Sequence, residues 1–281
     1  MPGTNLAEAL SAATARLAEA GVPSPRVDAE LLAAHLLGVS LGRVRALALM
    51  DAASPDGLED LVAERATRVP LQHITGRAFF RHLELQVGPG VFVPRPETET
   101  VAQHAIDQAL ALPAAKVVDL GAGSGAIAAA VASEVPSATV YAVELSELAH
   151  AWAERNLAPL GVTLLREDLR TALSAHDGTF DVVVSNPPYI PAEAVPREPE
   201  VADHDPQMAL YGGGADGMEL PAATAATAAR LLKPGGYFIM EHAEVQAAAV
   251  LSLLQAAGCW QQVATEYDLT GRERATSARR L

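Results

Sequence analysis

The chain has 281 residues, half of them hydrophobic and 19% charged. This composition is typical of a folded globular protein and excludes a disordered or fibrous chain. At about 150 residues per domain, the length predicts roughly two domains or one large one. The 34 acidic and 20 basic residues give a formal net charge of −14, which repels nucleic-acid phosphates and anionic membrane surfaces at long range. We therefore expect no direct nucleic-acid partner and no membrane partner.

The sequence also excludes several kinds of segment and site. It has no run of about 18 uncharged apolar residues, and its first ten residues lack the basic and apolar regions of a secretory signal. We therefore expect a cytoplasmic protein. The single cysteine, Cys259, excludes an internal disulfide framework, and we expect it to be a buried core thiol. No histidine cluster has metal-ligand spacing, so no metal site is expected.

Residues 1–75 have apolar positions at helical spacing and predict a small helical bundle. Thr4 is the expected N-cap of the first helix, and Ser54, followed by Pro55, is the expected N-cap of the fourth. The four predicted helices end at Gly21, at Gly38, at Met50 and near Arg68.

The pattern changes after the bundle. Residues 79–85 and 91–93 flank the turn-rich Gly88-Pro89-Gly90, which predicts a β-hairpin. We take residues 76–94 as a hairpin linker and residues 95–281 as a second domain. A helix is expected from about Thr98 to Leu112, with Glu97 and Glu99 near its positive end. These two carboxylates would stabilise the helix or line a cofactor entrance.

From Lys116 onward, strands alternate with helices, which indicates an α/β fold with a parallel sheet and crossover helices. The predicted strands are residues 116–120, 139–145, 162–165, 180–184, 236–241 and 259–266. One predicted helix begins at Gly125, and three others cover residues 146–156, 220–232 and 244–257.

A glycine-rich loop joins the first of these strands to its helix. It reads Asp119-Leu120-Gly121-Ala122-Gly123-Ser124-Gly125, and its glycines allow a tight turn and close approach of a ligand to the helix N-terminus. Glu144, at the end of the next strand, is placed to accept hydrogen bonds from ribose hydroxyls. Asp168, after the third strand, could meet an adenine amino group, or it could be a solvated loop carboxylate or a helix cap. An adenosine-containing ligand is therefore expected.

The glycines alone do not distinguish an NAD site from an S-adenosylmethionine site, because Gly121, Gly123 and Ala126 also satisfy the loose G-x-G-x-x-G/A dinucleotide-binding pattern. Asp119 favours the second ligand, since a carboxylate beside the loop suits a cationic amino-acid group and would repel a pyrophosphate. An NAD-dependent oxidoreductase is disfavoured further because no hydride-handling residues are evident.

The second motif, Asn186-Pro187-Pro188-Tyr189, follows the buried fourth strand directly. The prolines stiffen the loop and leave carbonyl oxygens free. The Asn186 side-chain oxygen and the Pro187 carbonyl could accept both hydrogens of a planar N–H₂ group, and Tyr189 offers an aromatic face. An ordinary proline-rich turn is improbable when the glycine loop lies on a neighbouring strand.

Asn-Pro-Pro-Tyr after the fourth strand is similar to the signature of amino-directed S-adenosylmethionine methyltransferases. Across nearly the whole chain, further segments resemble the release factor glutamine methyltransferase family. These segments are residues 70–76, 93–99, 119–130, 184–191, 213–217, 231–236, Glu241-His242 with Gln246, and 268–272.

The resemblance implies a Rossmann-like seven-stranded class I methyltransferase sheet. We expect the preceding helical bundle to dock the substrate, with a purely structural bundle as the alternative. It implies methyl transfer from S-adenosyl-L-methionine, leaving S-adenosyl-L-homocysteine, to N5 of the glutamine in the Gly-Gly-Gln loop of class I peptide chain release factors. The cofactor-binding positions that it implies, with those argued above, are Asp119, Gly121, Ala122, Gly123, Ser124, Gly125, Glu144, Asp168, Leu169 and Asn186. The substrate-binding positions are Asn186, Pro187, Pro188 and Tyr189, of which Asn186, Pro187 and Tyr189 are the catalytic candidates.

The chain departs from the family pattern at a few positions. Glu144 replaces a frequent Asp, Leu169 replaces a Trp of some members, Asp205-Pro206 replaces Glu-Pro, and Ala243 replaces a Gly. These changes concern the shape of the adenine pocket and leave the reaction unaffected. Two alternatives stay open: an adenine-N6 DNA or RNA methyltransferase, which would need a basic surface, and a non-enzymatic release-factor-binding module.

Overall fold

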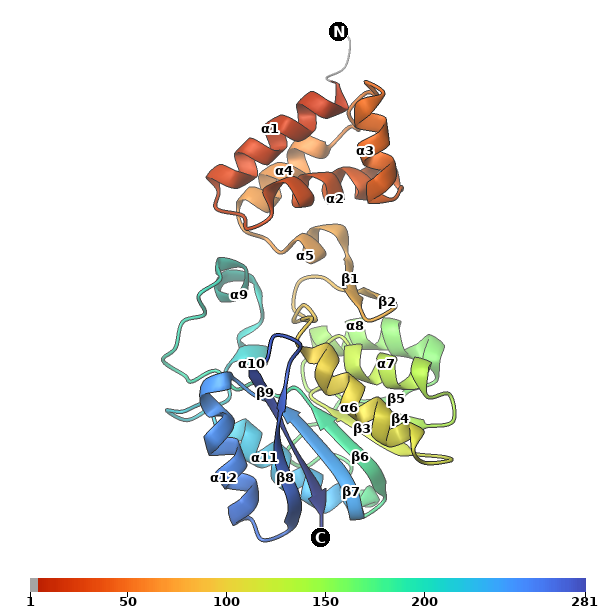
Figure 1. Cartoon of the computed structure of the whole chain (residues 1–281), viewed down its shortest axis with the longest axis vertical. Coiled ribbons are helices and arrows are strands. Elements are labelled where there is room, and N and C mark those ends of the chain that lie inside the picture. The colour runs from red at the N-terminus through yellow and green to blue at the C-terminus, as the bar shows by residue number, and fades with distance from the viewer. Residues whose placement is uncertain (1–4) are drawn as a thin grey trace. The chain divides into compact units, whose positions relative to one another are not determined.

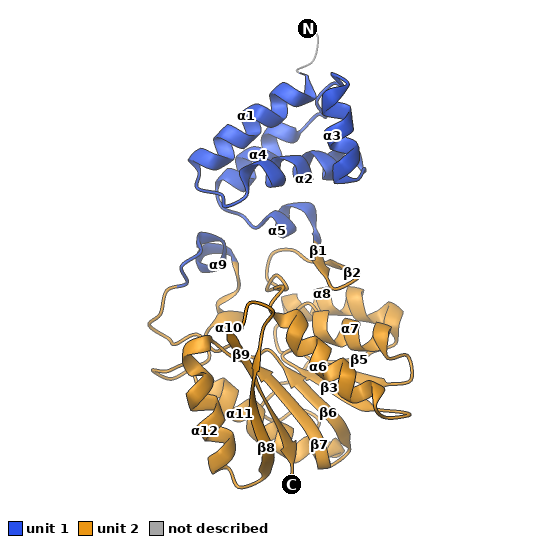
Figure 2. Cartoon of the chain, viewed as in Figure 1, with its two compact units in different colours: residues 1–77, 196–204 blue, residues 78–195, 205–281 orange. Residues whose placement is uncertain are grey.

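The structure is a computed structural model that describes residues 5–281. It divides into two compact units (Figures 1 and 2). Unit 1 is the helical part up to Arg77 together with Pro196–His204, and unit 2 comprises Ala78–Val195 and Asp205–Leu281. The chain therefore passes from one unit to the other after residues 77, 195 and 204.

Unit 1 is built from helices. They are α1 (Leu6–Glu19), α2 (Pro25–Leu37), α3 (Leu41–Leu49), α4 (Leu58–Ala66), α5 (Leu71–Thr75) and α9 (Pro199–His204). Leu10 and Leu17 of α1, Leu32 of α2 and Val62 of α4 lie in one buried apolar cluster. The bundle expected from helical spacing is therefore present, whereas α5 and α9 were not predicted. No single described helix is long and apolar enough to cross a membrane, although the bent pair of α2 and α3 passes that test by length and composition.

The helix ends of unit 1 follow some predictions and correct others. Gly38 ends α2 in the left-handed conformation, as predicted. The N-cap of α1 is Asn5, whose side chain accepts from the Ala7 N–H at 2.7 Å; Thr4 lies outside the described residues. The prediction for Ser54 is wrong, because α4 begins at Leu58 after Gly57. The segment before it is held extended, since Ala53 forms a bridge with Asn5.

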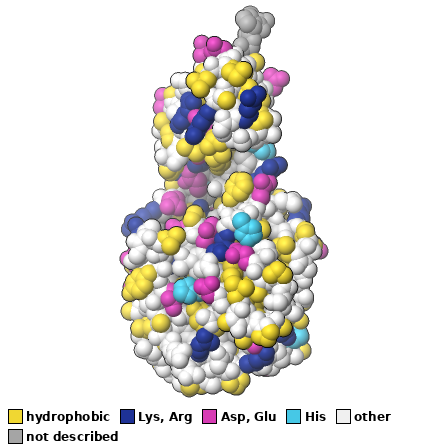
Figure 3. Space-filling view, turned by 45° about the vertical axis from the view of Figure 1, so that its right-hand side comes forward, with side chains coloured by type: hydrophobic (Ala, Val, Ile, Leu, Met, Phe, Trp, Pro, Cys, Tyr) yellow, Lys and Arg dark blue, Asp and Glu magenta, His cyan; other side chains and the backbone are white. Residues whose placement is uncertain are grey.

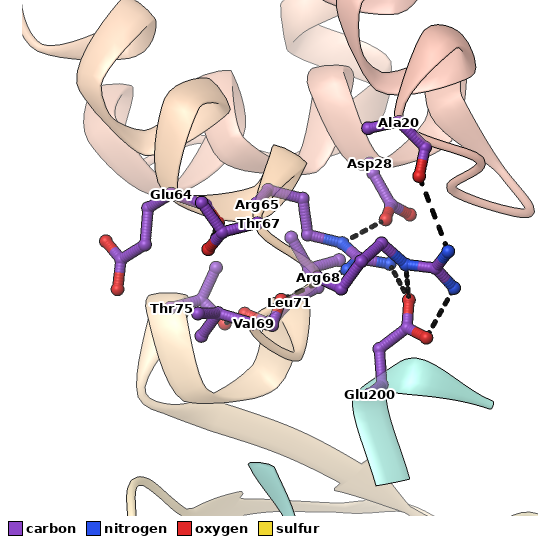
Figure 4. Close-up of polar contacts among 10 residues, drawn as sticks. All are labelled: Ala20, Asp28, Glu64, Arg65, Thr67, Arg68, Val69, Leu71, Thr75 and Glu200. Atoms are coloured by element: carbon purple, nitrogen blue, oxygen red, sulfur yellow. Dashed lines mark hydrogen bonds and ion pairs between the residues drawn. The ribbon is translucent and has the colours of Figure 1, made fainter. Parts of the chain in front are cut away.

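An ion-pair cluster joins α9 to the rest of unit 1 (Figure 4). The Glu200 carboxylate accepts from Arg65 Nη2 and Arg68 Nε, each at 2.8 Å, and from Arg68 Nη2 at 2.5 Å. Arg65 is buried and also donates from Nε to Asp28 at 2.8 Å. Burial alone would raise the pKa of Glu200, but the hydrogen bonds from Arg68 and Arg65 hold it at about 2.

We expect Glu200→Ala to lower the free energy of unfolding by about 3 kcal/mol near neutral pH, because it removes one partner of a buried pair and leaves Arg65 short of a counter-charge. The pKa of Glu200 is depressed from 4.5 to about 2, so its contribution is complete above pH 4.5 and is lost as the pH falls toward 2. Denaturant unfolding of the full chain, followed by circular dichroism, measures both effects. The exposed neighbour Glu198→Ala is the control, and equal stabilities of the two variants at neutral pH would contradict the assignment.

Unit 2 begins with a two-stranded sheet of β1 (Arg77–Phe80, whose first residue belongs to unit 1) and β2 (Leu83–Gln86). A hairpin was predicted here, but its turn was misplaced. The connection runs through Arg81 and His82, with Arg81 at φ 54°, and residues 91–93 form no strand. Gly88 and Gly90 serve close packing instead, because a Cβ would lie 2.4 Å from Trp152 at Gly88 and 2.7 Å from Leu148 at Gly90.

The main sheet has seven strands in the order β5-β4-β3-β6-β7-β9-β8. Its neighbours are parallel from β5 to β7, and β9 is antiparallel to both β7 and β8. The strands are β3 (Lys116–Leu120), β4 (Thr139–Val143), β5 (Thr163–Leu165), β6 (Phe180–Ser185), β7 (Leu232–Glu241), β8 (Trp260–Tyr267) and β9 (Glu273–Arg280). The seven-stranded α/β fold is confirmed, although β9 was not among the individually predicted strands.

Helices cover both faces of this sheet (Figure 1). The helices are α6 (Thr98–Leu110), α7 (Ala126–Glu134), α8 (Glu147–Leu157), α10 (Gln207–Leu210), α11 (Glu219–Leu231) and α12 (Ala247–Ala256), with short 3₁₀ turns at Ala158–Leu160, Ser174–His176 and Glu244–Gln246. Val182 and Val184 pack with α6, α7 and α8 on one face. Val183 packs with α11 and α12 on the other. Cys259, expected to be a buried core thiol, is partly buried and packs against this second cluster.

Candidate functional site

The glycine-rich loop lies between β3 and α7, as predicted. Gly121, Gly123 and Gly125 have φ values of 77°, 57° and 85°, a region that favours glycine. The N–H groups of Gly121 and Ala122 both donate to the Val143 carbonyl at 2.9 Å, which ties the loop to the end of β4. A Cβ at Gly123 would meet no atom of the described part of the chain within 4 Å. The loop is therefore held from behind and open at Gly123.

Asp119 is buried beside this loop and is only half satisfied. Its Oδ2 accepts from the Ala128 N–H at 3.1 Å, whereas Oδ1 is buried and has no partner among the described residues. Burial raises the pKa of Asp119 to about 7, against the lowering effect of the Ala128 hydrogen bond. A cationic group that contacted Oδ1 would satisfy this oxygen and favour the ionised form.

Glu144 links the end of β4 to the glycine loop. Its Oε2 accepts from the Gly123 N–H at 2.8 Å, and its Oε1 accepts from the Ser146 N–H at 2.7 Å. Burial raises the pKa of Glu144, opposed by these backbone hydrogen bonds. Although Glu is longer than the Asp often found here in the family, its carboxylate is therefore fixed against the loop.

Asp168 and Leu169 follow β5. The Asp168 carboxylate pairs with Arg170, whose Nη2 lies 2.5 Å from Oδ2, and hydrogen bonds from Arg170 lower the pKa of Asp168. Leu169 is buried, with Cδ2 at 3.7 Å from the position of a Cβ on Gly121. Leu169 thus packs against the glycine loop, and the adenine contact of Asp168 stays a prediction.

The Asn-Pro-Pro-Tyr loop begins where β6 ends. Because Leu120 of β3 and Ser185 of β6 are register partners, the glycine loop and this loop leave neighbouring strands at the same edge of the sheet. The Ser185 hydroxyl also donates to the Leu120 carbonyl at 2.6 Å. Asn186 Nδ2 donates to Thr98 Oγ1 at 3.3 Å. No described residue donates a hydrogen bond to Asn186 Oδ1 or to the Pro187 carbonyl.

A second segment supports the Asn-Pro-Pro-Tyr loop from behind. Ile190 N–H donates to the Leu210 carbonyl at 2.8 Å, and Gly212 N–H donates back to Ile190 at 2.9 Å. Gln246 Nε2 donates to the carbonyls of Tyr189 at 2.8 Å and Asp216 at 2.9 Å. The resemblance included Ile190, Asp216 and Gln246 but not Leu210 or Gly212, and no local pattern indicated that these residues brace the loop.

Tyr189 and Glu241 extend the site toward the end of β7. Tyr189 Oη lies 3.5 Å from Glu241 Oε1, and burial raises the pKa of Tyr189. Burial also raises the pKa of Glu241 to about 7. Sequence reasoning assigned no role to Glu241 or Thr98. Among residues 5–281, no group of three His, Cys, Asp or Glu side chains could hold a metal ion.

The fold, the glycine-rich loop and the adjacent Asn-Pro-Pro-Tyr loop define an α/β methyltransferase. The family model described as "PrmC N-terminal domain" matches residues 8–76, and the "Methyltransferase small domain" matches residues 83–198. Release factor glutamine methyltransferases of Streptomyces coelicolor and Mycolicibacterium smegmatis are 51% and 48% identical to this chain, with 95% and 99% of each chain covered. The chain belongs to the release factor glutamine methyltransferase family.

One relative is named for a different activity. A 4-amino-L-phenylalanine/4-methylamino-L-phenylalanine methyltransferase of Streptomyces pristinaespiralis is 40% identical over 92% of this chain and 90% of its own length. A planar aromatic amine and a carboxamide both present N–H₂ groups.

Proposed function

We propose that this chain methylates N5 of the glutamine in the Gly-Gly-Gln loop of class I peptide chain release factors. The observation that carries the proposal is the Asn-Pro-Pro-Tyr loop, whose Asn186 and Pro187 oxygens are free of hydrogen bonds from described residues and adjoin the glycine loop at one sheet edge. The near-complete coverage by the Streptomyces coelicolor release factor glutamine methyltransferase supports the same substrate class.

S-adenosyl-L-methionine fits the glycine-loop region on the evidence of this chain's own atoms. Asp119 Oδ1, which has no partner among residues 5–281, suits the ammonium group of a methionyl moiety, and the open backbone at Gly123 admits a close ligand. We assign ribose recognition to Glu144, and the adenine side to Asp168 and Leu169. The other proposed cofactor contacts are Gly121, Ala122, Ser124, Gly125 and Asn186. When bound, the cofactor supplies an electrophilic methyl group on sulfur.

The residues of the Asn-Pro-Pro-Tyr loop would orient the substrate amide. A carboxamide nitrogen is a poor nucleophile because its lone pair is delocalised, so holding it in place matters more than removing a proton beforehand. Asn186 Oδ1 and the Pro187 carbonyl accept its two N–H groups, while Pro188 and Tyr189 bound the flat amide. The same oxygens stabilise positive charge that develops on the nitrogen. The proton is then lost to water.

Unit 1 is the proposed docking element for the release factor, and the cytoplasm is the proposed location, because that is where release factors act. On the face drawn in Figure 3, Lys and Arg side chains are interspersed with acidic and hydrophobic ones. With a net charge of −14, this mixture favours a protein partner over a nucleic acid.

The test is incubation of the full chain with methyl-labelled S-adenosyl-L-methionine and, separately, a class I release factor, duplex DNA and 4-amino-L-phenylalanine. We expect label on the Gly-Gly-Gln glutamine, located by mass spectrometry, and none when that glutamine is replaced by alanine. Preferential labelling of adenine or of the free amino acid would overturn the proposed substrate. Absence of S-adenosyl-L-methionine binding would favour a non-enzymatic binding module.

Glu144→Ala should weaken S-adenosyl-L-methionine binding more than it slows the chemical step. The carboxylate both holds the Gly123 N–H and is our proposed ribose acceptor. Hydrogen bonds to a charged group contribute about 1.5–3 kcal/mol, which corresponds to a loss of roughly 10- to 100-fold in affinity. Isothermal calorimetry measures the affinity, and saturating cofactor isolates kcat. Unchanged affinity would refute this role.

A further inference from the structure

The Asn186 amide is attached to a short hydrogen-bonded network behind the site. Asn186 Nδ2 donates to Thr98 Oγ1 at 3.3 Å, and Thr98, the first residue of α6, is buried. The Thr98 hydroxyl in turn lies near enough to the buried Glu241 carboxyl, at the end of β7, to lower its pKa. Three segments of unit 2 that are distant in sequence thus meet directly behind Asn186.

Glu241 is an unusual group to bury for stability alone. It is 3% exposed, and its Oε2 has no hydrogen-bond partner among the described residues. The groups that face it are Thr98, Tyr189, Arg274 and Glu97. A buried, incompletely satisfied carboxyl costs free energy, so its position beside Thr98 and Tyr189 indicates a role in the site.

The chemistry of an amide explains what this network can do. An asparagine amide has an oxygen and an N–H₂ group of similar size, and a half-turn exchanges them. An ionised carboxylate only accepts hydrogen bonds, so Glu241 requires the Thr98 hydroxyl to donate toward it. The lone pairs of Thr98 Oγ1 then face Asn186 and select the rotamer in which Nδ2 donates to them. Asn186 Oδ1 is left for the substrate.

We propose that Thr98 and Glu241 are positioning residues that orient the Asn186 amide, so that its oxygen faces the N–H₂ group of the substrate. This inference rests on the proposed role of Asn186. In the opposite rotamer, two N–H₂ groups would face each other and the substrate hydrogen bond would be lost. The proper orientation therefore determines how often a bound substrate is held productively.

The inference is tested with Thr98→Val, which removes the hydroxyl and keeps the shape, and Thr98→Ser, which keeps the hydroxyl. We expect Thr98→Val to lower kcat by about 10- to 100-fold at saturating cofactor, the range for an unsatisfied buried polar group, and Thr98→Ser to retain most activity. Thr224→Val is the matched control, because Thr224 is fully buried and its hydroxyl bonds within its own helix. Wild-type kcat in Thr98→Val, or equal losses in Val and Ser, would overturn the proposal.

The pH dependence of kcat in the wild-type chain gives an independent test. Burial raises the pKa of Glu241 to about 7, and a protonated Glu241 can donate to Thr98 and release the Thr98 hydroxyl to face Asn186. In the wild type we expect kcat to fall as the pH drops through about 7, which forms an acid limb of the pH profile. We expect this limb to be absent in Thr98→Val and Glu241→Gln. Saturating cofactor removes the effect of Asp119, whose pKa is also about 7. An unchanged limb in both variants would contradict the inference.

These measurements separate the two proposals. If the wild-type chain does not methylate a release factor, the proposed function fails before the variants are compared. If the wild type is active and Thr98→Val matches it, only the orientation network fails. A purely structural role of Glu241 predicts a lower melting temperature for Glu241→Gln with unchanged kcat. We expect instead a lower kcat with an unchanged melting temperature.

Discussion

Replacing Asn186 with alanine should lower kcat for methyl transfer by about 100- to 10,000-fold. The variant removes an acceptor that would hold one substrate N–H and stabilise the charge that develops on the nitrogen. The Pro187 carbonyl alone leaves the amide free to rotate. Because carboxamide reactivity depends strongly on orientation, the loss should fall on kcat at saturating cofactor rather than on folding.

The measurement is label transfer to a release factor at saturating concentrations of both substrates. Circular dichroism and thermal unfolding should match wild type. Asn186 is half-buried, and the hydrogen bond that its side chain donates to Thr98 is long, at 3.3 Å, so its loss should have little effect on stability. Near-wild-type methylation by this variant would eliminate the proposed mechanism.

Gly217→Ala should lower kcat by about 100-fold or more, since a displacement of roughly 1 Å in a positioned group can have that effect. Gly217 has φ 74°, and a Cβ there would lie 2.2 Å from the Tyr189 carbonyl oxygen and 2.9 Å from the Ile190 carbonyl carbon. Neither atom can move without shifting the Asn-Pro-Pro-Tyr loop. The same displacement would disturb the bond from Gln246 to Tyr189.

Gly161→Ala separates this clash from backbone strain. Gly161 has a similar φ of 70°, but a Cβ there would meet nothing within 4 Å. Both variants should lose about 1–3 kcal/mol of stability from the left-handed conformation, and only Gly217→Ala should lose activity. Equal kcat values in the two variants would show that the loop tolerates the displacement.

Local patterns predicted much of unit 2 because its strands and caps carry strong local signals. Val182, Val183 and Val184 form a buried β-branched strand, and Ser146, where a helix was predicted to begin, is the N-cap of α8 and accepts from Ala149. The strand β9 was missed because its sequence, ERATSARR, lacks the aromatic, Val and Ile residues typical of strands. Its position depends instead on backbone pairing with β7 on one side and β8 on the other.

The candidate site divides in a similar way. The glycine loop and Asn-Pro-Pro-Tyr are contiguous motifs, so the chemistry they indicate is visible in the sequence. Thr98 lies 88 residues before Asn186, and Gln246 lies 57 residues after Tyr189. Only the folded sheet brings such partners together, so neither spacing nor composition could assign their roles.

The ion pairs of Glu200 hold two separate stretches of chain together in unit 1, so no continuous fragment that contains the bundle alone reproduces this unit. A fragment ending at residue 77 contains Arg65 and Arg68 without the Glu200 carboxylate that both contact, and leaves Asp28 as the ion-pair partner of Arg65. Conversely, unfolding of the bundle would release residues 196–204, which begin seven residues after Tyr189. The cooperative unfolding unit, or foldon, therefore need not coincide with a continuous domain. Amide exchange in α9 should follow that of α2 and α4 rather than that of its sequence neighbours, and chimaeras between relatives should exchange residues 196–204 together with the bundle.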